Sequence, residues 1–139
     1  MKLEVKGIKA VGSSPKTNLY PEFLNDKSTK PVRKLHQSIK GYEPTLLVVL
    51  DNLAKQLCVN KIYVKDESNR FSMNAFKALG ATYAMSKVLC DRLGVSIDEV
   101  DFEYFKSEEV KSKIESLVFV TATDGNHGRA VAWTAQMIG

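Results

Sequence analysis

The feature that most constrains the fold of this chain is an apolar run followed by a glycine-containing turn and a helix. Residues 117–120 read Leu-Val-Phe-Val, which suits a strand buried on both faces. The turn covers residues 121–128, and residues 129–138 are helical by composition. In parallel α/β sheets this order places the turn at the carboxyl end of a strand, where ligands bind. The sequence therefore predicts a helix-rich α/β fold with a few parallel strands.

The turn carries side chains that suit a binding site. Asp124 and Asn126 bring a carboxylate and an amide to it, and Gly125 and Gly128 let the backbone approach a flat ligand closely. The alternative is that the aspartate and asparagine only form the turn and cap the helix. His127 could act as a general base, although a histidine in a first helical turn is more often a solvent-exposed or capping residue. Neither a Walker loop nor a GxGxxG motif is present, which argues against mononucleotide binding.

A second stretch places one lysine near the start of a long apolar helix. The pattern predicts a helix over residues 74–93, capped by Asn74 and ended by Gly94. Lys77 shares its helical face with small and apolar residues three, four, seven and eleven positions further on. The helix dipole and an apolar surround both favour the neutral, nucleophilic amine that forms imines with carbonyl groups. The alternative is an ordinary lysine that extends from a packed first turn into solvent.

The remaining sequence alternates between apolar patterns and polar breaks. Short strands are predicted at residues 3–8 and 62–64, and helices are predicted over residues 31–40, 47–60, around 102–105 and 107–117. The loop of residues 65–70 leads into the Lys77 helix. Its charged residues, Asp66, Glu67 and Arg70, are most simply interpreted as solvated loop residues.

Composition narrows the function classes. The 139 residues are 44% apolar, which is enough for one core, and the net charge of +4 is scattered rather than gathered in a basic stripe, so nucleic acid is not expected. Cys58 and Cys90 are far apart and predict neither a disulfide nor zinc, and the two histidines lack partners at metal-ligand spacing. The sequence contains no run of about 18 apolar residues, so a membrane span is not expected. A cytoplasmic protein without a metal site is the expectation.

Together the two informative stretches resemble a known family. Residues 65–80 (KDESNRFSMNAFKALG) and 121–133 (TATDGNHGRAVAW) look like the matching segments of the diaminopropionate ammonia-lyases. These belong to the fold-type II pyridoxal-phosphate enzymes, which are built on the tryptophan synthase β fold. A lysine motif with a glycine–asparagine loop is common to that wider group. The combination of an acid in place of the loop serine with the motifs Lys-Asp-Glu-Ser and Gly-Arg-x-Val-Ala-Trp is much more specific to the ammonia-lyases.

The resemblance implies pyridoxal 5'-phosphate as cofactor, an amino-acid substrate and an α,β-elimination that converts 2,3-diaminopropionate to pyruvate and ammonia. It further implies amino-acid catabolism by a cytoplasmic homodimer. Lys77 would bind the cofactor covalently, Asn126 would hydrogen-bond its 3-oxygen, and Phe76 would bound its ring. Asp124, the second catalytic residue, would act as an acid or base. The other residues of the substrate loop would be Thr123, Gly125 and His127, with backbone amides available to the substrate carboxylate.

Enzymes of this family are several times longer, so the resemblance implies an amino-terminal portion of a two-lobed enzyme, with a lobe boundary near residues 75–95. Such a portion lacks the later glycine loop for the cofactor phosphate and is expected to bind cofactor weakly and to show little activity. The sequence departs from the family at Leu46, where a proline is expected, at Ser72-Met73, where Gly-Leu is expected, and at Ala130, where glycine is expected. Two alternatives remain: a pyridoxal enzyme of the serine or threonine dehydratase type, and a non-catalytic, self-associating fragment.

Overall fold

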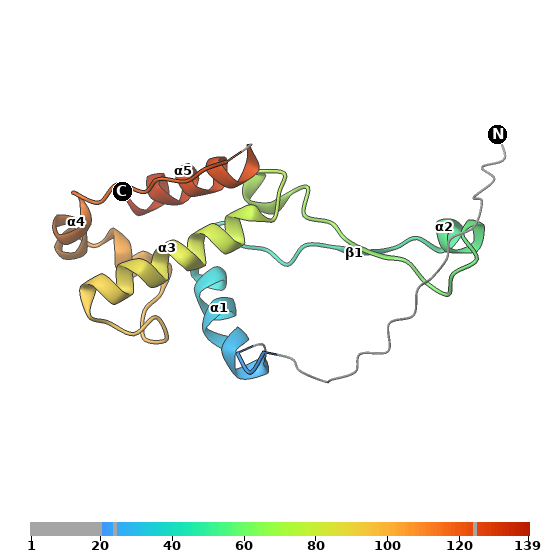
Figure 1. The fold of residues 1–139 in the computed structure, drawn as a ribbon, viewed down its shortest axis with the longest axis horizontal. Helices are drawn as coiled ribbons and strands as arrows, with labels where there is room; N and C mark the ends of the chain where they lie inside the picture. The colour runs from blue at the N-terminus through green and yellow to red at the C-terminus, as the bar shows by residue number, and fades with distance from the viewer. Residues whose placement is uncertain (1–20, 24, 124) are drawn as a thin grey trace.

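The computed structural model describes residues 21–23, 25–123 and 125–139. A helical body and a projecting arm make up the molecule (Figure 1). The strand predicted at residues 3–8 lies outside the described residues. In chain order the elements are α1 (Asp26–Ser38), β1 (Leu47–Val49), α2 (Asp51–Gln56), β2 (Tyr63–Lys65), the 3₁₀ helix η1 (Arg70–Ser72), α3 (Lys77–Leu93), the 3₁₀ helix η2 (Phe102–Lys106), α4 (Glu108–Ile114) and α5 (Asn126–Ile138).

Helix α3 is the centre of the body, and α1, η2 and α5 gather around it (Figure 1). Its carboxyl end is as predicted, because Gly94 adopts φ 70° and closes the helix. Its amino end is not as predicted. Asn74 has φ 56° and caps nothing, and the helix begins three residues later, at Lys77, after Phe76. The lysine is therefore the first helical residue.

The main hydrophobic core lies between α3 and the segments that follow it. Phe102 and Phe105 of η2 are fully buried and meet edge to face, with ring centroids 6.2 Å apart. Each buried phenylalanine contributes about 2–3 kcal/mol through burial. They confirm the short apolar helix predicted there. The other buried members of this core are Leu35, Ile39, Leu89, Cys90, Val100, Val110, Ile114 and Ile138.

Helices α3 and α5 pack side by side and run in the same direction (Figure 1). Near their amino ends, Ala78 and Ala130 belong to one buried cluster. Near their carboxyl ends, Leu89 and Ile138 line one small pocket. The first residues of both helices consequently lie at the same end of the molecule.

Helix α1 begins earlier than the predicted start at residue 31. Asn25 accepts hydrogen bonds from the amides of Lys27 and Ser28, and the Ser28 hydroxyl accepts one from the Asn25 amide, which completes a capping box. Pro31 lies inside the helix rather than at its start. The cap pairs the first amides of the helix, so this polar segment is helical.

The arm consists of β1, α2 and β2, and it extends away from the body (Figure 1). The two strands are antiparallel, with Leu47 opposite Lys65 and Val49 opposite Tyr63. The helix predicted over residues 47–60 is therefore right for α2 but wrong at both ends, because residues 47–49 form a strand and the helix stops at Gln56. The β-branched valines of β1 satisfy their backbone by pairing with a strand that lies some 16 residues away in the chain, a partner that helical periodicity cannot reveal.

No strand forms at residues 117–120, where the sequence predicts one. Val118 and Val120 are 84% and 89% exposed. Within the described residues the only sheet is the antiparallel pair of the arm, so a parallel neighbour for this segment is absent there. A single extended segment without a neighbouring strand has no ladder to join, and the prediction of parallel strands is not met in this part of the molecule.

Candidate functional site

Lys77 is exposed at the start of α3, and its Nζ lies 5.1 Å from the centroid of the Phe76 ring. The Phe76 ring is itself 59% exposed. Of the small and apolar residues that share the lysine's face, Gly80, Ala84 and Val88 are also exposed, whereas Ala81 is buried. The composition of this face is as predicted, but its apolar enclosure is not observed among the described residues. The amine is open to an incoming molecule.

The turn before α5 is organised by Thr123. Its hydroxyl accepts hydrogen bonds from the amides of Gly125 (3.1 Å) and Gly128 (2.8 Å). A Cβ on Gly128 would overlap Thr123 Cγ2, so only glycine fits there without a shift. Gly125 has φ 148°, which side chains rarely adopt. Thr123 thus caps the first turn of α5 through the Gly128 amide. The family resemblance placed Thr123 in the substrate loop, and capping was the alternative role considered for Asp124 and Asn126.

Asn126 and His127 are exposed in the first turn of α5. Asp124 lies outside the described residues. Since α3 and α5 are parallel, Lys77 and Asn126, each the first residue of its helix, lie at the same end of the body. The structure thus places the Lys77 stretch and the glycine turn at the same end of the helical body.

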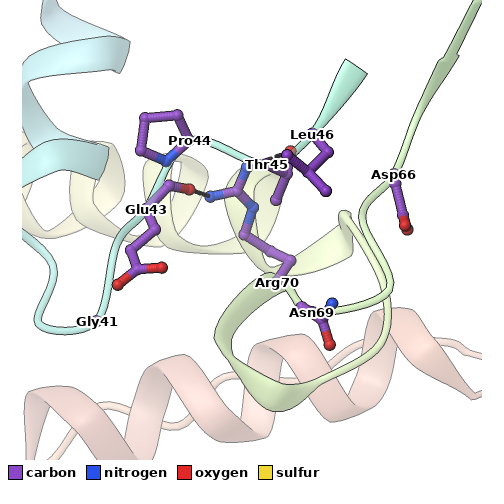
Figure 2. Close-up of a pocket in the computed structure, with 8 residues that line it drawn as sticks. All are labelled: Gly41, Glu43, Pro44, Thr45, Leu46, Asp66, Asn69 and Arg70. Atoms are coloured by element: carbon purple, nitrogen blue, oxygen red, sulfur yellow. Dashed lines mark hydrogen bonds between the residues drawn. The ribbon is translucent and has the colours of Figure 1, made fainter. Parts of the chain in front are cut away.

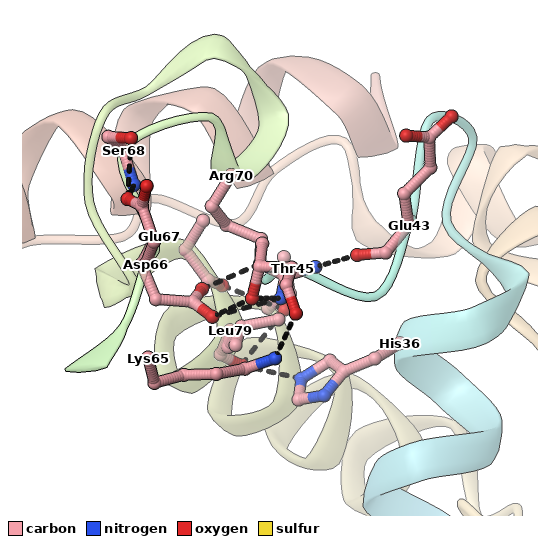
Figure 3. Close-up of polar contacts among 11 residues, drawn as sticks. His36, Glu43, Thr45, Lys65, Asp66, Glu67, Ser68, Arg70 and Leu79 are labelled. Carbon is pink, nitrogen blue, oxygen red and sulfur yellow. Dashed lines mark hydrogen bonds and ion pairs between the residues drawn. The ribbon is translucent and has the colours of Figure 1, made fainter. Parts of the chain in front are cut away.

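A polar cluster that sequence reasoning missed stands before Lys77. The side chains of Arg70 and Glu67 are only 4% and 15% exposed, so their interpretation as solvated loop residues is wrong. Arg70 Nε donates to Glu67 Oε2 at 2.8 Å, and a second guanidinium nitrogen lies 3.1 Å from Oε1. This is a two-point ion pair (Figure 3). A glutamate three residues before an arginine was the sequence signal for it.

The Arg70 guanidinium also reaches across to the start of the arm. It donates to the Glu43 carbonyl at 2.7 Å and to Thr45 Oγ1 at 3.2 Å, and the Thr45 hydroxyl donates in turn to Glu67. Figure 2 shows Arg70 between these partners at the wall of a pocket of about 260 Å³. The Asp66 carboxylate, by contrast, bonds within its own loop, where it accepts from the amide and the hydroxyl of Ser68.

These bonds set the charge state of the cluster. Hydrogen bonds from Arg70 lower the pKa of Glu67, and the Thr45 hydroxyl adds to this effect, against the opposing effect of burial. Hydrogen bonds to Glu67 raise the pKa of Arg70. Both groups remain charged at neutral pH, and they compensate each other's burial.

Three residues between Arg70 and Lys77 adopt the left-handed backbone conformation that L-residues avoid. Phe71, Ser72 and Asn74 have φ of 49°, 56° and 56°. Each non-glycine residue in the left-handed region costs about 1–2 kcal/mol. Ser72 stands where the family resemblance led us to expect glycine. The segment is therefore strained and depends on contacts made elsewhere.

His36 of α1 supports the first turn of α3. It is buried, and its Nε2 lies 2.8 Å from the carbonyl oxygen of Leu79, two residues beyond Lys77 (Figure 3). Its ring meets the Tyr83 ring edge to face at 6.4 Å. Burial lowers the pKa of His36, with a further contribution from the charge of Arg70, although the bond to Leu79 opposes both. A neutral ring that donates from Nε2 satisfies the carbonyl.

Two features are absent from the described residues. Over residues 21–23, 25–123 and 125–139, no group of three or more histidine, cysteine or acidic side chains is placed to hold a metal ion. None of the helices in that part of the chain is long and apolar enough to cross a membrane.

The family model described as "Pyridoxal-phosphate dependent enzyme" matches residues 39–139. The chain belongs to this family of pyridoxal-phosphate dependent enzymes. The match begins at the end of α1 and includes the arm, the Arg70 cluster, Lys77 and the glycine turn.

Individual members of the family are also similar to the chain. It is 47% identical over 117 residues to diaminopropionate ammonia-lyase of Escherichia coli K12, which covers 84% of this chain and 28% of that protein. The apo crystal structure of the E. coli enzyme matches with a TM-score of 0.74 and 46% identity, over 86% of this chain and 31% of that one. Its complex with an aminoacrylate-PLP azomethine reaction intermediate matches with a TM-score of 0.71 and 44% identity, over 84% and 28%.

These similarities confirm the predicted resemblance and the predicted partial fold-type II fold. The chain spans about 28% of the length of the curated relative.

Proposed function

We propose that this chain carries the cofactor lysine of a pyridoxal-phosphate-dependent ammonia-lyase, which converts 2,3-diaminopropionate and water to pyruvate and two molecules of ammonia. The observation that carries the proposal is the position of Lys77. Its exposed amine stands on the first residue of α3, at the same end as the glycine turn of α5. The chain that contains it is 47% identical to a diaminopropionate ammonia-lyase. Because the alignment covers 28% of that relative, the complete reaction is proposed for a protein of the relatives' length.

The residues present fit the cofactor. Within the described residues Lys77 takes part in no ion pair, so its amine is available to an aldehyde. Asn126 offers an exposed amide to an oxygen on the ring, and the exposed Phe76 ring suits contact with a flat heterocycle. When bound, pyridoxal phosphate would supply the electron sink for the charge left on the substrate Cα.

Proton movements are assigned to Lys77 and Asp124. Removal of the α-proton requires a base near neutrality, and the β-amine must leave with a proton, so one acid and one base are needed. The role of Asp124 rests on the sequence resemblance. Gly125 and His127 would line the substrate side of the loop. Thr123 would shape that loop, since its hydroxyl already holds the amides of Gly125 and Gly128.

The cofactor proposal is tested with the 139-residue chain. The chain is incubated with pyridoxal phosphate, reduced with borohydride and digested, and the modified peptide is identified by mass spectrometry. We expect the adduct on Lys77, its loss in Lys77→Ala and its retention in Lys87→Ala, which removes another exposed lysine of the same helix. An adduct spread evenly over the exposed lysines would contradict the proposal.

Substrate and activity are tested separately. Pyruvate formation from 2,3-diaminopropionate is compared with that from serine and threonine in a protein of the relatives' length. Preference for serine or threonine would favour the dehydratase alternative. For the 139-residue chain, weak cofactor binding and little lyase activity are expected, and a full imine absorbance band with comparable rates would refute this.

We also propose a homodimer. Support comes from the arm, where apolar side chains on the paired strands are open to solvent, including Leu47 (61% exposed) and Tyr63 (59%). Exposed apolar surface of this kind is typical of protein contacts. Sizing chromatography of Leu47→Lys tests it, with Asn52→Lys as a control that adds the same charge to exposed α2. Equal elution of both variants with the wild-type dimer would rule out the arm as the interface.

Cytoplasmic location and a role in amino-acid catabolism complete the proposal. Cys58 and Cys90 are both free cysteines, which is compatible with the reducing compartment proposed here. The division into two lobes near residues 75–95 is retained as part of the same proposal, and limited proteolysis of a protein of the relatives' length would test it.

A further inference from the structure

Arg70 and Phe71 are consecutive residues that are anchored to different parts of the molecule. Arg70 is bonded to Glu67, Thr45 and the Glu43 carbonyl, which lie where the arm joins the body (Figures 2 and 3). The Phe71 ring stacks on Trp133 of α5, with centroids 4.9 Å apart and planes 30° from parallel. The chain that enters α3 is thus held from two sides.

The two anchors are also joined to each other. The Arg70 guanidinium carbon lies 5.7 Å from the Phe71 ring centroid and 5.2 Å from that of Tyr42. Guanidinium groups are attracted to aromatic faces at such distances. A continuous chain of side-chain contacts therefore runs from the base of the arm to α5, through Tyr42, Arg70, Phe71 and Trp133.

Arg70 is not placed to bind substrate. Its side chain is 4% exposed. Four hydrogen bonds to the protein engage its three nitrogens, and a guanidinium has five N–H donors. Little donor capacity remains for a carboxylate or phosphate, so any effect of Arg70 on the reaction acts through another residue.

We propose that Arg70 is a positioning residue for Lys77. Its ion pair with Glu67, at the base of the arm, holds residues 71–74, three of which have positive φ, in the conformation that starts α3 at Lys77. The inference rests on the proposed function of Lys77 for its catalytic meaning, but the conformational claim can be measured without cofactor.

The first measurement is amide hydrogen exchange in the 139-residue chain. The Met73 amide donates to the Arg70 carbonyl and the Leu79 amide to the Phe76 carbonyl, so both report on the start of α3. In Arg70→Met we expect these amides to exchange about tenfold faster, whereas Leu89 and Cys90 in the last turns of α3 change less than about twofold. Arg92→Met, which removes an exposed arginine near the end of α3, is the matched control and should leave both ends unchanged.

The second measurement is borohydride trapping of pyridoxal phosphate, expressed as the ratio of adduct on Lys77 to adduct on Lys87. We expect this ratio to fall about tenfold in Arg70→Met and to stay at the wild-type value in Arg92→Met. Glu67→Gln keeps the shape of the partner but removes its charge, and an intermediate ratio is expected because charge-assisted bonds are roughly twice as strong as neutral ones. If Arg70→Met does not fold, Glu67→Gln decides in both measurements.

Unchanged exchange at Met73 and Leu79 would overturn the inference. Equal acceleration along the whole of α3 would overturn it as well, because Arg70 would then stabilise the fold without positioning Lys77. If the exchange pattern is as expected but the wild-type chain traps no cofactor on Lys77, the positioning of this segment stands and the proposed function fails. The two failures are thereby distinguishable.

Discussion

Ala78 of α3 and Ala130 of α5 are both fully buried in one cluster between the two helices. Side chains of a single methyl group allow the helix axes to approach closely. Thr82 and Thr134, also buried, turn their hydroxyls back to the carbonyls of Ala78 and Ala130, so both hydroxyls are paired within their own helices. This close contact brings the first turns of the two helices together.

We therefore expect Ala130→Leu to destabilise the protein by about 1–3 kcal/mol, because added volume cannot be accommodated in a tight contact. Urea denaturation of each variant and of the wild type measures the change in the free energy of unfolding. Ala84→Leu, at an exposed position of α3, is the control and should change it by less than about 0.5 kcal/mol. Equal effects of the two variants would show that the contact is not tightly packed.

Gly128→Ala should also destabilise, by about 1–3 kcal/mol, because the new methyl group would overlap Thr123 Cγ2. Adding Thr123→Ser removes that methyl group and keeps the hydroxyl that bonds the turn, so part of the loss should be recovered. Gly80→Ala is the contrasting variant: its Cβ meets nothing within 4 Å, and alanine in a helix interior is worth about 0.5–1 kcal/mol over glycine. Additive effects in the Thr123–Gly128 double variant would contradict the overlap.

Ser72→Gly is expected to stabilise the protein by about 0.5–1 kcal/mol. Relief of the left-handed strain at φ 56° outweighs the extra entropy that glycine loses on folding. Ser112→Gly, at an exposed position inside α4, should destabilise by a similar amount. Thermal unfolding of both variants checks the opposite signs, and a loss of stability in Ser72→Gly would show that the serine side chain supports the segment.

Stability should fall as the pH drops from about 7 to 5, because of His36. Burial lowers its pKa below the ordinary value of 6.5. As the pH falls below 6.5, the unfolded chain therefore binds a proton at His36 before the folded chain does. The contribution of neutral His36 to the free energy of unfolding is complete above pH 6.5. It is lost as the pH falls toward the lowered pKa of the folded state. Urea unfolding at several pH values should show this slope in the wild type and in His127→Gln, the variant at the exposed histidine. His36→Gln should remove it, since glutamine can still donate to Leu79.

The candidate site could be proposed from sequence where its signals are local. A lysine before a run of small residues and a glycine turn before a helix point to Lys77 and to residues 123–128 without any knowledge of the fold. The Arg70 cluster was not predictable in the same way. Its partners Glu43 and Thr45 lie more than 20 residues earlier, and burial of a charged pair depends on what covers it.

The sequence by itself determined the end of α3 at Gly94, the short apolar helix with Phe102 and Phe105, and α4 and most of α5, because caps, glycines and helical periodicity act over a few residues. Tertiary structure alone decided the antiparallel pairing of residues 47–49, the lack of a strand at residues 117–120 and the start of α3 at Lys77 rather than Asn74. Each of these depends on a contact, or the lack of one, with a segment distant in the chain. Such contacts decide whether an apolar run becomes a strand and whether a strained turn is held.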